Sequence, residues 1–287
     1  KPSDSRPSWG GGGAMVAVPA VSPPGNVESS DGETDEASPD APALFRRRMG
    51  SLVWRVGADL ELGTVATATA ALYFQRFFLV EKEGSFDAVR VAIACVWLSA
   101  KVNEMAVRLR DIVNSFLALQ GQGQEGKAMQ MEAYWTLRDE LVSHEQAVLR
   151  AMTFDVEPTP AYAFLSEFAR LVHCEPGERG LVALAWTLLN DAFCSDLCAL
   201  TPAPRMAMAS LLLAVEMGRR VPELRREAER VAGCVDALCC EPQMEDFLGL
   251  SAGAGGDELE EVCRDLLALY EVDRKHAGAG RVDTKGF

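Results

Sequence analysis

The chain has 287 residues, of which 48% are apolar, and its formal net charge at pH 7 is −14. This apolar content is typical of a globular protein with a sizeable core, and the length suits one large domain or two ordinary ones. The acidity argues against nucleic acid as a direct partner, because nucleic-acid binders display a basic surface. No stretch approaches the roughly 20 apolar residues that a membrane-spanning helix needs, so we predict no membrane association.

Residues 1–43 predict a disordered tail. They contain a glycine run at 10–13, several prolines and the acidic stretch 28–40. Large apolar residues are too few here to offset the entropy that ordering would cost. Trp9 is the one candidate docking residue of this segment, although a plain disordered leader is the simpler interpretation.

From residue 44 onward, apolar residues recur at helical spacing. Five helices are predicted, and the second and third are apolar on more than one face, as central helices are. The second carries Val65, Leu72 and Tyr73 on its apolar stripe, and the third carries Val96 and Trp97. The predicted helices lie at 44–60, 62–78, 88–104, 109–117 and 134–155.

Pro158 and Pro160 predict a break, since the residue before a proline is disfavoured in a helix. Five further helical runs follow, beginning near residues 161, 181, 206, 224 and 259, and no segment alternates as strands do. We therefore predict an all-α protein with two tandem five-helix bundles. Their predicted extents are 44–157 and 158–273, followed by a flexible C-terminal tail at 274–287.

The eight cysteines indicate neither a disulfide framework nor a metal site. Most lie on predicted apolar helix faces, where a free thiol behaves as a small hydrophobe. The paired short-loop spacing of a zinc site is missing, as are phosphate-loop and nucleophile-elbow motifs. We expect no metal, no cofactor and no catalytic residue. Because a secretory signal pattern is also missing, we expect reduced thiols in the nucleus and cytoplasm.

Four segments, in this order, resemble successive signatures of a cyclin box: 70–78 (AALYFQRFF), 94–104 (ACVWLSAKVNE), 109–116 (LRDIVNSF) and 145–155 (EQAVLRAMTFD). Residues 134–141 (YWTLRDEL), 182–193 (VALAWTLLNDAF) and 265–273 (DLLALYEVD) resemble the cyclin-Q branch, also called cyclin-M, which partners cyclin-dependent kinase 10. Cyclins of the L, K and T types share much of the first box. The resemblance covers roughly residues 44–273 and implies two tandem cyclin boxes.

This resemblance also implies a binding face. In the cyclin family the first box binds the C-helix of a kinase, and the matching polar pair here is Lys101 and Glu145. A lysine supplies three donors and a carboxylate supplies acceptors for backbone groups at a helix end. Taken singly, Lys101 could be an ordinary lysine at a helix end and Glu145 a solvated helix residue. The other matching positions are Leu98, Val102, Leu149 and Phe154, with Glu104 as a further acidic position.

Some residues depart from the family pattern or carry charge without a clear role. Asn103 stands where the family has the first of two acidic residues, which bears on the choice of kinase. Arg46, Arg47 and Arg48 interrupt the apolar patch with which cell-cycle cyclins recruit substrates, and we expect them on an exposed helix face. Asp191 and Asp196 are expected to face solvent or to cap a helix.

The resemblance predicts a regulatory and activating subunit of a cyclin-dependent serine/threonine kinase, in a heterodimer with that kinase and without enzymatic activity of its own. Its setting would be transcription or the control of the cell cycle. Two alternatives stay open: a cyclin-fold general transcription factor of the TFIIB type, which binds DNA and a TATA-binding protein, and an all-helical enzyme. The net charge and the Lys101–Glu145 pair count against the first, and the missing site residues count against the second.

Overall fold

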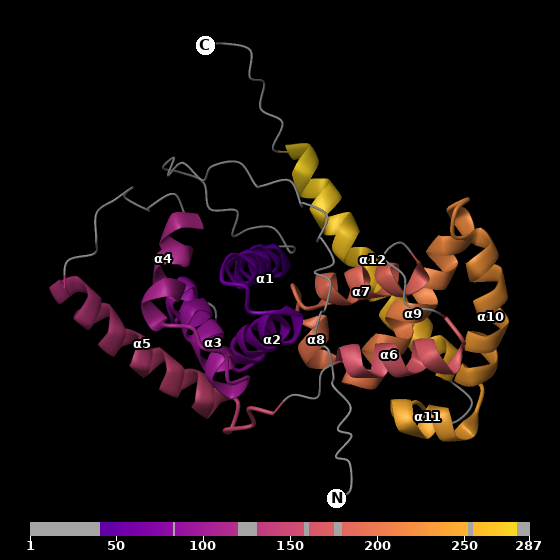
Figure 1. Cartoon of the computed structure of the whole chain (residues 1–287), viewed down its shortest axis with the longest axis horizontal. Helices are drawn as coiled ribbons and strands as arrows, with labels where there is room; N and C mark the ends of the chain where they lie inside the picture. Colours follow the sequence, from indigo (N-terminus) through magenta and orange to yellow (C-terminus); the bar gives the residue numbers. More distant parts are fainter. Residues whose placement is uncertain are drawn as a thin grey trace, which may run out of the picture.

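The computed structural model describes residues 41–82, 84–119, 131–157, 161–174, 180–251 and 255–279. Within these ranges the chain is helical and contains no strand, which confirms the predicted all-α class (Figure 1). Residues 1–40 of the predicted tail, which include Trp9, and residues 280–287 of the predicted C-terminal tail lie outside the described residues. The remaining residues of the two predicted tails are helical, at the start of α1 (41–43) and at the end of α12 (274–279). The helices are α1 (Ala41–Asp59), α2 (Thr64–Val80), α3 (Ala88–Val102), α4 (Leu109–Leu119), α5 (Met131–Ala151), α6 (Ala161–Leu171), α7 (Leu181–Ala192), α8 (Leu197–Leu200), α9 (Ala203–Arg220), α10 (Arg225–Cys239), α11 (Pro242–Leu248) and α12 (Gly255–Ala279).

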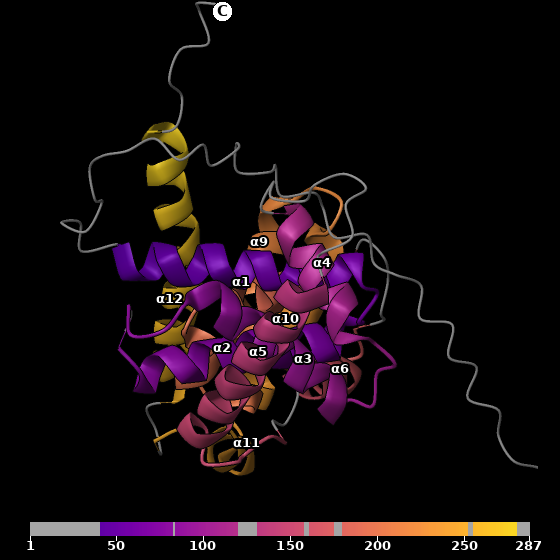
Figure 2. The same cartoon turned by 90° about the vertical axis from the view of Figure 1, so that its left-hand side faces the viewer.

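Helices α1–α5 pack around α3, which contacts the other four. Figure 2 shows α1 and α5 crossing this group in different directions. Helix α2 is buried along most of its length and provides the large rings of Tyr73, Phe74 and Phe77 to the core. Val65, predicted on the apolar stripe, is 43% exposed. It lies in the first turn of α2, where the neighbouring helices do not cover it. The spacing of apolar residues within one helix does not show how far its neighbours extend.

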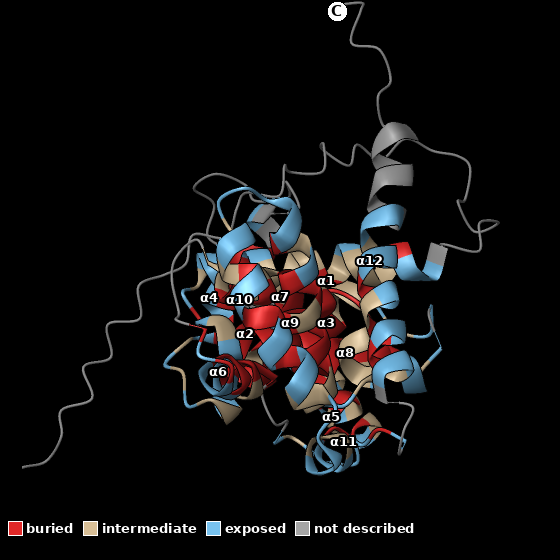
Figure 3. Ribbon diagram, turned by 90° about the vertical axis from the view of Figure 1, so that its right-hand side faces the viewer, coloured by how far each residue is buried: buried red, intermediate tan, exposed pale blue. Residues whose placement is uncertain are grey.

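Helices α6–α12 pack around α9, which contacts α6, α7, α10, α11 and α12. Two of these helices, α8 and α11, were not predicted from the sequence. They span only four and seven residues, which is too short for an apolar period to emerge. Figure 3 shows the buried residues between the helices of this half, with exposed residues along the outer side of α12.

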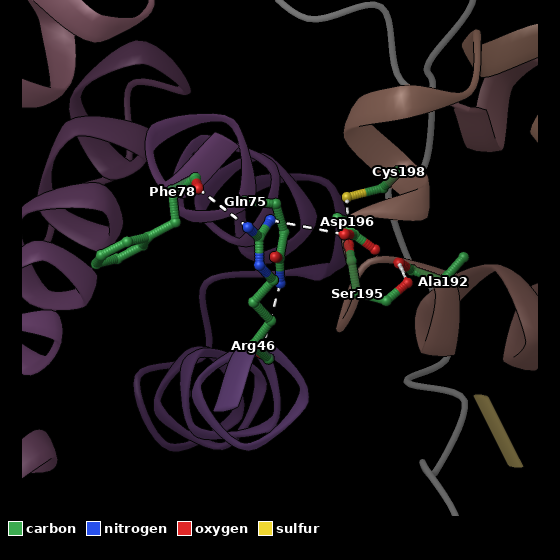
Figure 4. A network of polar contacts seen from close by, with 7 residues as sticks. All are labelled: Arg46, Gln75, Phe78, Ala192, Ser195, Asp196 and Cys198. Carbon is green, nitrogen blue, oxygen red and sulfur yellow. Dashed lines mark hydrogen bonds and ion pairs between the residues drawn. The ribbon is translucent and has the colours of Figure 1, made fainter. Parts of the chain in front are cut away.

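The two groups of helices meet along α1 and α2. An added Cβ at Gly50 of α1 would lie 2.7 Å from the Cα atom of Cys194, so the two backbones touch there. Arg46 of α1 donates to the Phe78 carbonyl at 3.0 Å and pairs with Asp196 at 3.6 Å (Figure 4). The buried Gln75 amide of α2 donates to the Arg46 carbonyl. Arg46 therefore joins α1, α2 and the turn before α8.

A second contact joins the same two groups. Arg47 donates to the Asp191 carbonyl at 3.0 Å, and its guanidinium lies 5.8 Å from the ring centroid of Tyr270. The Tyr270 hydroxyl donates to the Asp191 carboxylate. The expectation of an exposed basic helix face is thus wrong for Arg46 and Arg47 and holds only for Arg48. The two aspartates also take part in these contacts between the groups, since the Asp191 carboxylate accepts from Tyr270 and Asp196 pairs with Arg46. These partners come from distant segments and reach the aspartates only in the folded chain.

Candidate functional site

The end of α3 forms the first part of the predicted binding face. After Val102, the amide of Met105 donates to the Ala100 carbonyl at 2.8 Å and the amide of Glu104 to the Lys101 carbonyl at 3.2 Å. This is the Schellman arrangement that closes a helix. Glu104 occupies its left-handed position with φ 54°, where glycine is usual. The turn holds the exposed Glu104 beside Lys101, which lies in the last turn of α3, where the helix dipole favours a cation.

Helix α5 provides the partner of Lys101. The Lys101 ammonium donates to the Glu145 carboxylate, and the two side chains are 46% and 11% exposed respectively. Within the described residues, Glu145 is the only buried residue of the charged type. A second ion pair, between Arg90 and Glu140 at 3.2 Å, joins the same two helices. The structure thus brings together two residues that are 44 positions apart and makes Glu145 a buried acceptor rather than a solvated helix residue.

Trp97 completes the surroundings of Lys101. The Lys101 Nζ atom lies 4.0 Å from the centroid of the Trp97 ring, within cation–π range. Trp97 is half-buried and packs against the core. The apolar period alone predicts Trp97 only on the apolar stripe of this helix. The i, i+4 spacing of an aromatic and a lysine was the signal that could have found the contact.

Asn103, the departure from the family pattern, turns its amide back into α3. It donates to the Ser99 carbonyl at 2.9 Å and to the Ser99 hydroxyl at 3.2 Å. The buried Ser99 hydroxyl donates in turn to the Ala66 carbonyl of α2 at 2.6 Å. Asn103 therefore stabilises the end of α3 and, through Ser99, its connection to α2. Of the two residues at the positions of the family's acidic pair, only Glu104 carries a negative charge.

Phe154 forms the third part of the face, beyond the end of α5. Its side chain is 67% exposed, and its backbone has a φ of 61° next to Thr153 at 53°. The amides of Thr153 and Phe154 close α5 in a second Schellman arrangement. The Tyr73 hydroxyl donates to the Val156 carbonyl at 2.5 Å, and Arg76 pairs with Asp155 at 3.4 Å. Both contacts come from α2 and anchor the segment that presents this exposed ring.

The remaining predicted residues differ in exposure. Val102 and Leu149 are half-buried and pack against the core from α3 and α5. Leu98 is only 5% exposed and belongs to the core itself. In the free chain, Leu98 therefore supports the face from beneath. The binding of a kinase by these seven residues stays a prediction.

In the described part of the chain, no group of three His, Cys, Asp or Glu side chains lies close enough to hold a metal ion. None of the described helices is both long and apolar enough to cross a membrane. A half-open cavity of about 470 Å³ lies where α2, α6 and α8 meet, lined mostly by apolar side chains such as Leu72, Phe164 and Phe193. It contains none of the predicted site residues.

Comparison with known proteins agrees with the helical architecture and with the motifs of the first group of helices. Residues 28–157 match the family model "Cyclin, N-terminal domain". Over these residues the chain is similar to the N-terminal domain of cyclins. The matched part contains Lys101, Glu145 and the five other predicted residues, and it extends beyond the described residues at its beginning.

Several cyclins of known sequence are similar to the chain at moderate identity. Cyclin-L2 of Mus musculus is 27% identical over 231 residues, which cover 78% of this chain and 40% of the relative. Cyclin pch1 of Schizosaccharomyces pombe is 29% identical over 178 residues, covering 62% of this chain and 52% of the relative. The chain therefore spans about two fifths to one half of the length of these relatives.

A solved structure, that of the yeast RNA Pol II CTD kinase CTDK-1 complex, contains a chain with a similar fold. The TM-score is 0.55 at 16% identity, and the match covers 72% of this chain and 69% of that chain. At this identity the similarity shows the fold alone. It extends past the 130 residues of the N-terminal domain, and the predicted boundaries at 44–157 and 158–273 stay predictions.

Proposed function

We propose that the chain is a cyclin, the regulatory and activating subunit of a cyclin-dependent serine/threonine kinase, and that it binds the C-helix of that kinase through its first cyclin box. The observation that carries the proposal is the Lys101–Glu145 pair. A buried carboxylate within α5 holds a half-exposed ammonium at the surface, in the last turn of α3. Glu104 follows the end of α3 and Phe154 the end of α5, and both are exposed, so they would add an acceptor and an apolar contact.

The chemistry suits a helix of a partner protein. Apolar contacts alone hold two surfaces together without fixing their register, whereas a paired ammonium and carboxylate recognise particular backbone groups. By holding the C-helix inward, the cyclin would place the kinase's own lysine–glutamate ion pair. Thermodynamically the cyclin would shift the kinase population toward its active state, and the kinase would supply all catalytic groups. A heterodimer interface of about 2,000 Å² or more is expected.

The resemblance to cyclin-Q makes a kinase similar to cyclin-dependent kinase 10 our first candidate partner. The fold shared with a chain of an RNA Pol II CTD kinase complex favours a role in transcription and hence in the nucleus. No similarity reported above supports a role in the cytoplasm. A DNA-binding factor of the TFIIB type is not favoured, because the chain carries a net charge of −14 and its Lys101 ammonium is already paired with Glu145.

The test is to co-express the full chain with each member of a panel of cyclin-dependent kinases, including cyclin-dependent kinase 10, and to measure retention and kinase activity. We expect one kinase to be retained and activated. Lys101→Ala should weaken that binding by two to four decades, because a desolvated pair that loses one member costs roughly 3–5 kcal/mol. The exposed Lys82 provides the matched control Lys82→Ala, which should bind as the unaltered chain does.

The apolar part of the face is tested by a matched pair of variants. Phe154→Ala should weaken binding, whereas Phe247→Ala removes a ring of similar exposure from α11 and should not. Retention of no kinase by the unaltered chain would contradict the proposal. Full binding by both Lys101→Ala and Phe154→Ala would show that the kinase uses another surface.

A further inference from the structure

The inference concerns Trp97, and it rests on the function proposed above. Lys101 is held from two sides: its ammonium donates to Glu145 of α5, and it lies 4.0 Å from the centroid of the Trp97 ring one turn earlier in α3. An ammonium has three donors. With Glu145 accepting from one of them and the ring covering one side, the remaining donors stay available to a partner.

The two contacts differ in what they can fix. A single ion pair lets a lysine swing on its flexible four-carbon stem, because the hydrogen bond constrains only the end of the chain. The Trp97 ring is half-buried and packs against the core, so it cannot follow such a movement. A ring that is itself immobile and that covers the ammonium restricts the whole side chain to one region of the surface.

We propose that Trp97 is a positioning residue: its indole ring holds the Lys101 ammonium at the end of α3, so that the face meets the kinase with its central donor already ordered. Ordering before binding removes part of the entropy that a long side chain would otherwise lose in the complex. The cation–π contact also strengthens when the partner excludes water from it. Both effects increase the affinity for the kinase without any direct contact between Trp97 and that kinase.

The chain contains a matched contact for comparison. Trp135 and Arg138 of α5 form another cation–π pair that involves a tryptophan, with the guanidinium 5.1 Å from the ring centroid. Trp135 is 48% exposed, and neither residue belongs to the predicted face. Trp135→Leu therefore removes the same kind of ring and the same kind of contact elsewhere in the molecule.

The first experiment tests, in the full chain without any kinase, whether the Lys101 side chain lies against the Trp97 ring. In the chain labelled with ¹³C-lysine, the ε-methylene protons of Lys101 should resonate upfield of ordinary lysine values, because they lie against an aromatic ring. Trp97→Leu should abolish this shift and Trp135→Leu should preserve it. An ordinary Lys101 signal in the unaltered chain would overturn the inference.

The second experiment measures affinity for the kinase that the unaltered chain retains. Trp97→Leu should weaken binding about tenfold, Trp97→Phe should recover part of the loss because it keeps an aromatic face, and Trp135→Leu should have no effect. Equal losses in Trp97→Leu and Trp97→Phe would indicate packing alone and overturn the inference, as would unchanged affinity in Trp97→Leu. These results leave the proposed function standing, whereas failure of the unaltered chain to bind any kinase overturns both.

Discussion

Lys101 and Glu145 form an ion pair whose two members are unequally buried, with side-chain exposures of 46% and 11%. The two possible deletions are therefore not equivalent. Without Glu145, Lys101 stays hydrated, but without Lys101 the buried carboxylate loses its only recorded partner among the described residues.

We predict from this asymmetry that Lys101→Met lowers the free energy of unfolding more than Glu145→Gln does. An unsatisfied buried polar group costs about 1–3 kcal/mol, whereas losing an exposed ion-pair contact costs roughly 0–1 kcal/mol. Urea unfolding at neutral pH measures both variants. Equal effects would mean that water reaches Glu145 freely. The same unfolding data show how much of any loss of kinase binding by these variants comes from lower stability of the chain.

The close approach of α1 to Cys194 predicts that Gly50→Ala is destabilising. Alanine is favoured over glycine inside helices by about 1 kcal/mol, but here its Cβ atom would lie 2.7 Å from backbone atoms that cannot move aside easily. We expect a net loss of about 1–3 kcal/mol. Gly233→Ala in α10 is the matched control, because its added Cβ meets nothing within 4 Å and should stabilise the chain. Thermal unfolding of the two variants should thus shift in opposite directions.

The anchoring of the Phe154 segment predicts a local effect of Tyr73→Phe. The variant removes the hydroxyl that donates to the Val156 carbonyl and keeps the buried ring. We expect a loss of about 1 kcal/mol in the free energy of unfolding and faster hydrogen exchange at residues 152–156. Mass spectrometry of the exchanged peptides measures this, with helix α9 as the internal reference. Unchanged exchange would mean that the Arg76–Asp155 pair and the turn suffice to hold Phe154.

Stability should fall at alkaline pH. Burial, aided by the hydrogen bond to the Glu227 carboxylate, raises the pKa of the Cys174 thiol from 9.0 to about 12. Burial also raises the pKa of Tyr73 from 10.0 to about 12. Both groups stay neutral in the folded chain and ionise earlier in the unfolded chain. Their contribution to stability is therefore complete below about pH 9 and is lost as the pH rises toward 12, by at most about 1.4 kcal/mol per pH unit for each group.

Urea unfolding at pH 8, 9 and 10 checks this expectation. Cys174→Ala should flatten the decline between pH 9 and 10, and Cys234→Ala, at an exposed position, should leave it unchanged. A decline that is identical in the two variants would remove Cys174 from the explanation.

The long helices could be predicted from the sequence because each buries a face of its own. In α3 and α9, apolar residues recur often enough to indicate where each helix lies in the sequence and that other helices surround it. The period failed where a helix is short, as in α8, and where coverage by neighbours ends, as at Val65. In both cases the outcome depends on the neighbouring helices and not on the residues of the helix itself.

The sequence by itself determined the all-α class, the order of the long helices and the identity of the Lys101–Glu145 pair, because local periodicity and short family motifs are written in neighbouring residues. Only the tertiary structure decided that Glu145 is buried, that Trp97 lies against Lys101, and that Arg46 joins α1 to Asp196, 150 positions away. Burial and pairing depend on which surfaces meet once the chain has collapsed, and a one-dimensional pattern does not contain those distances.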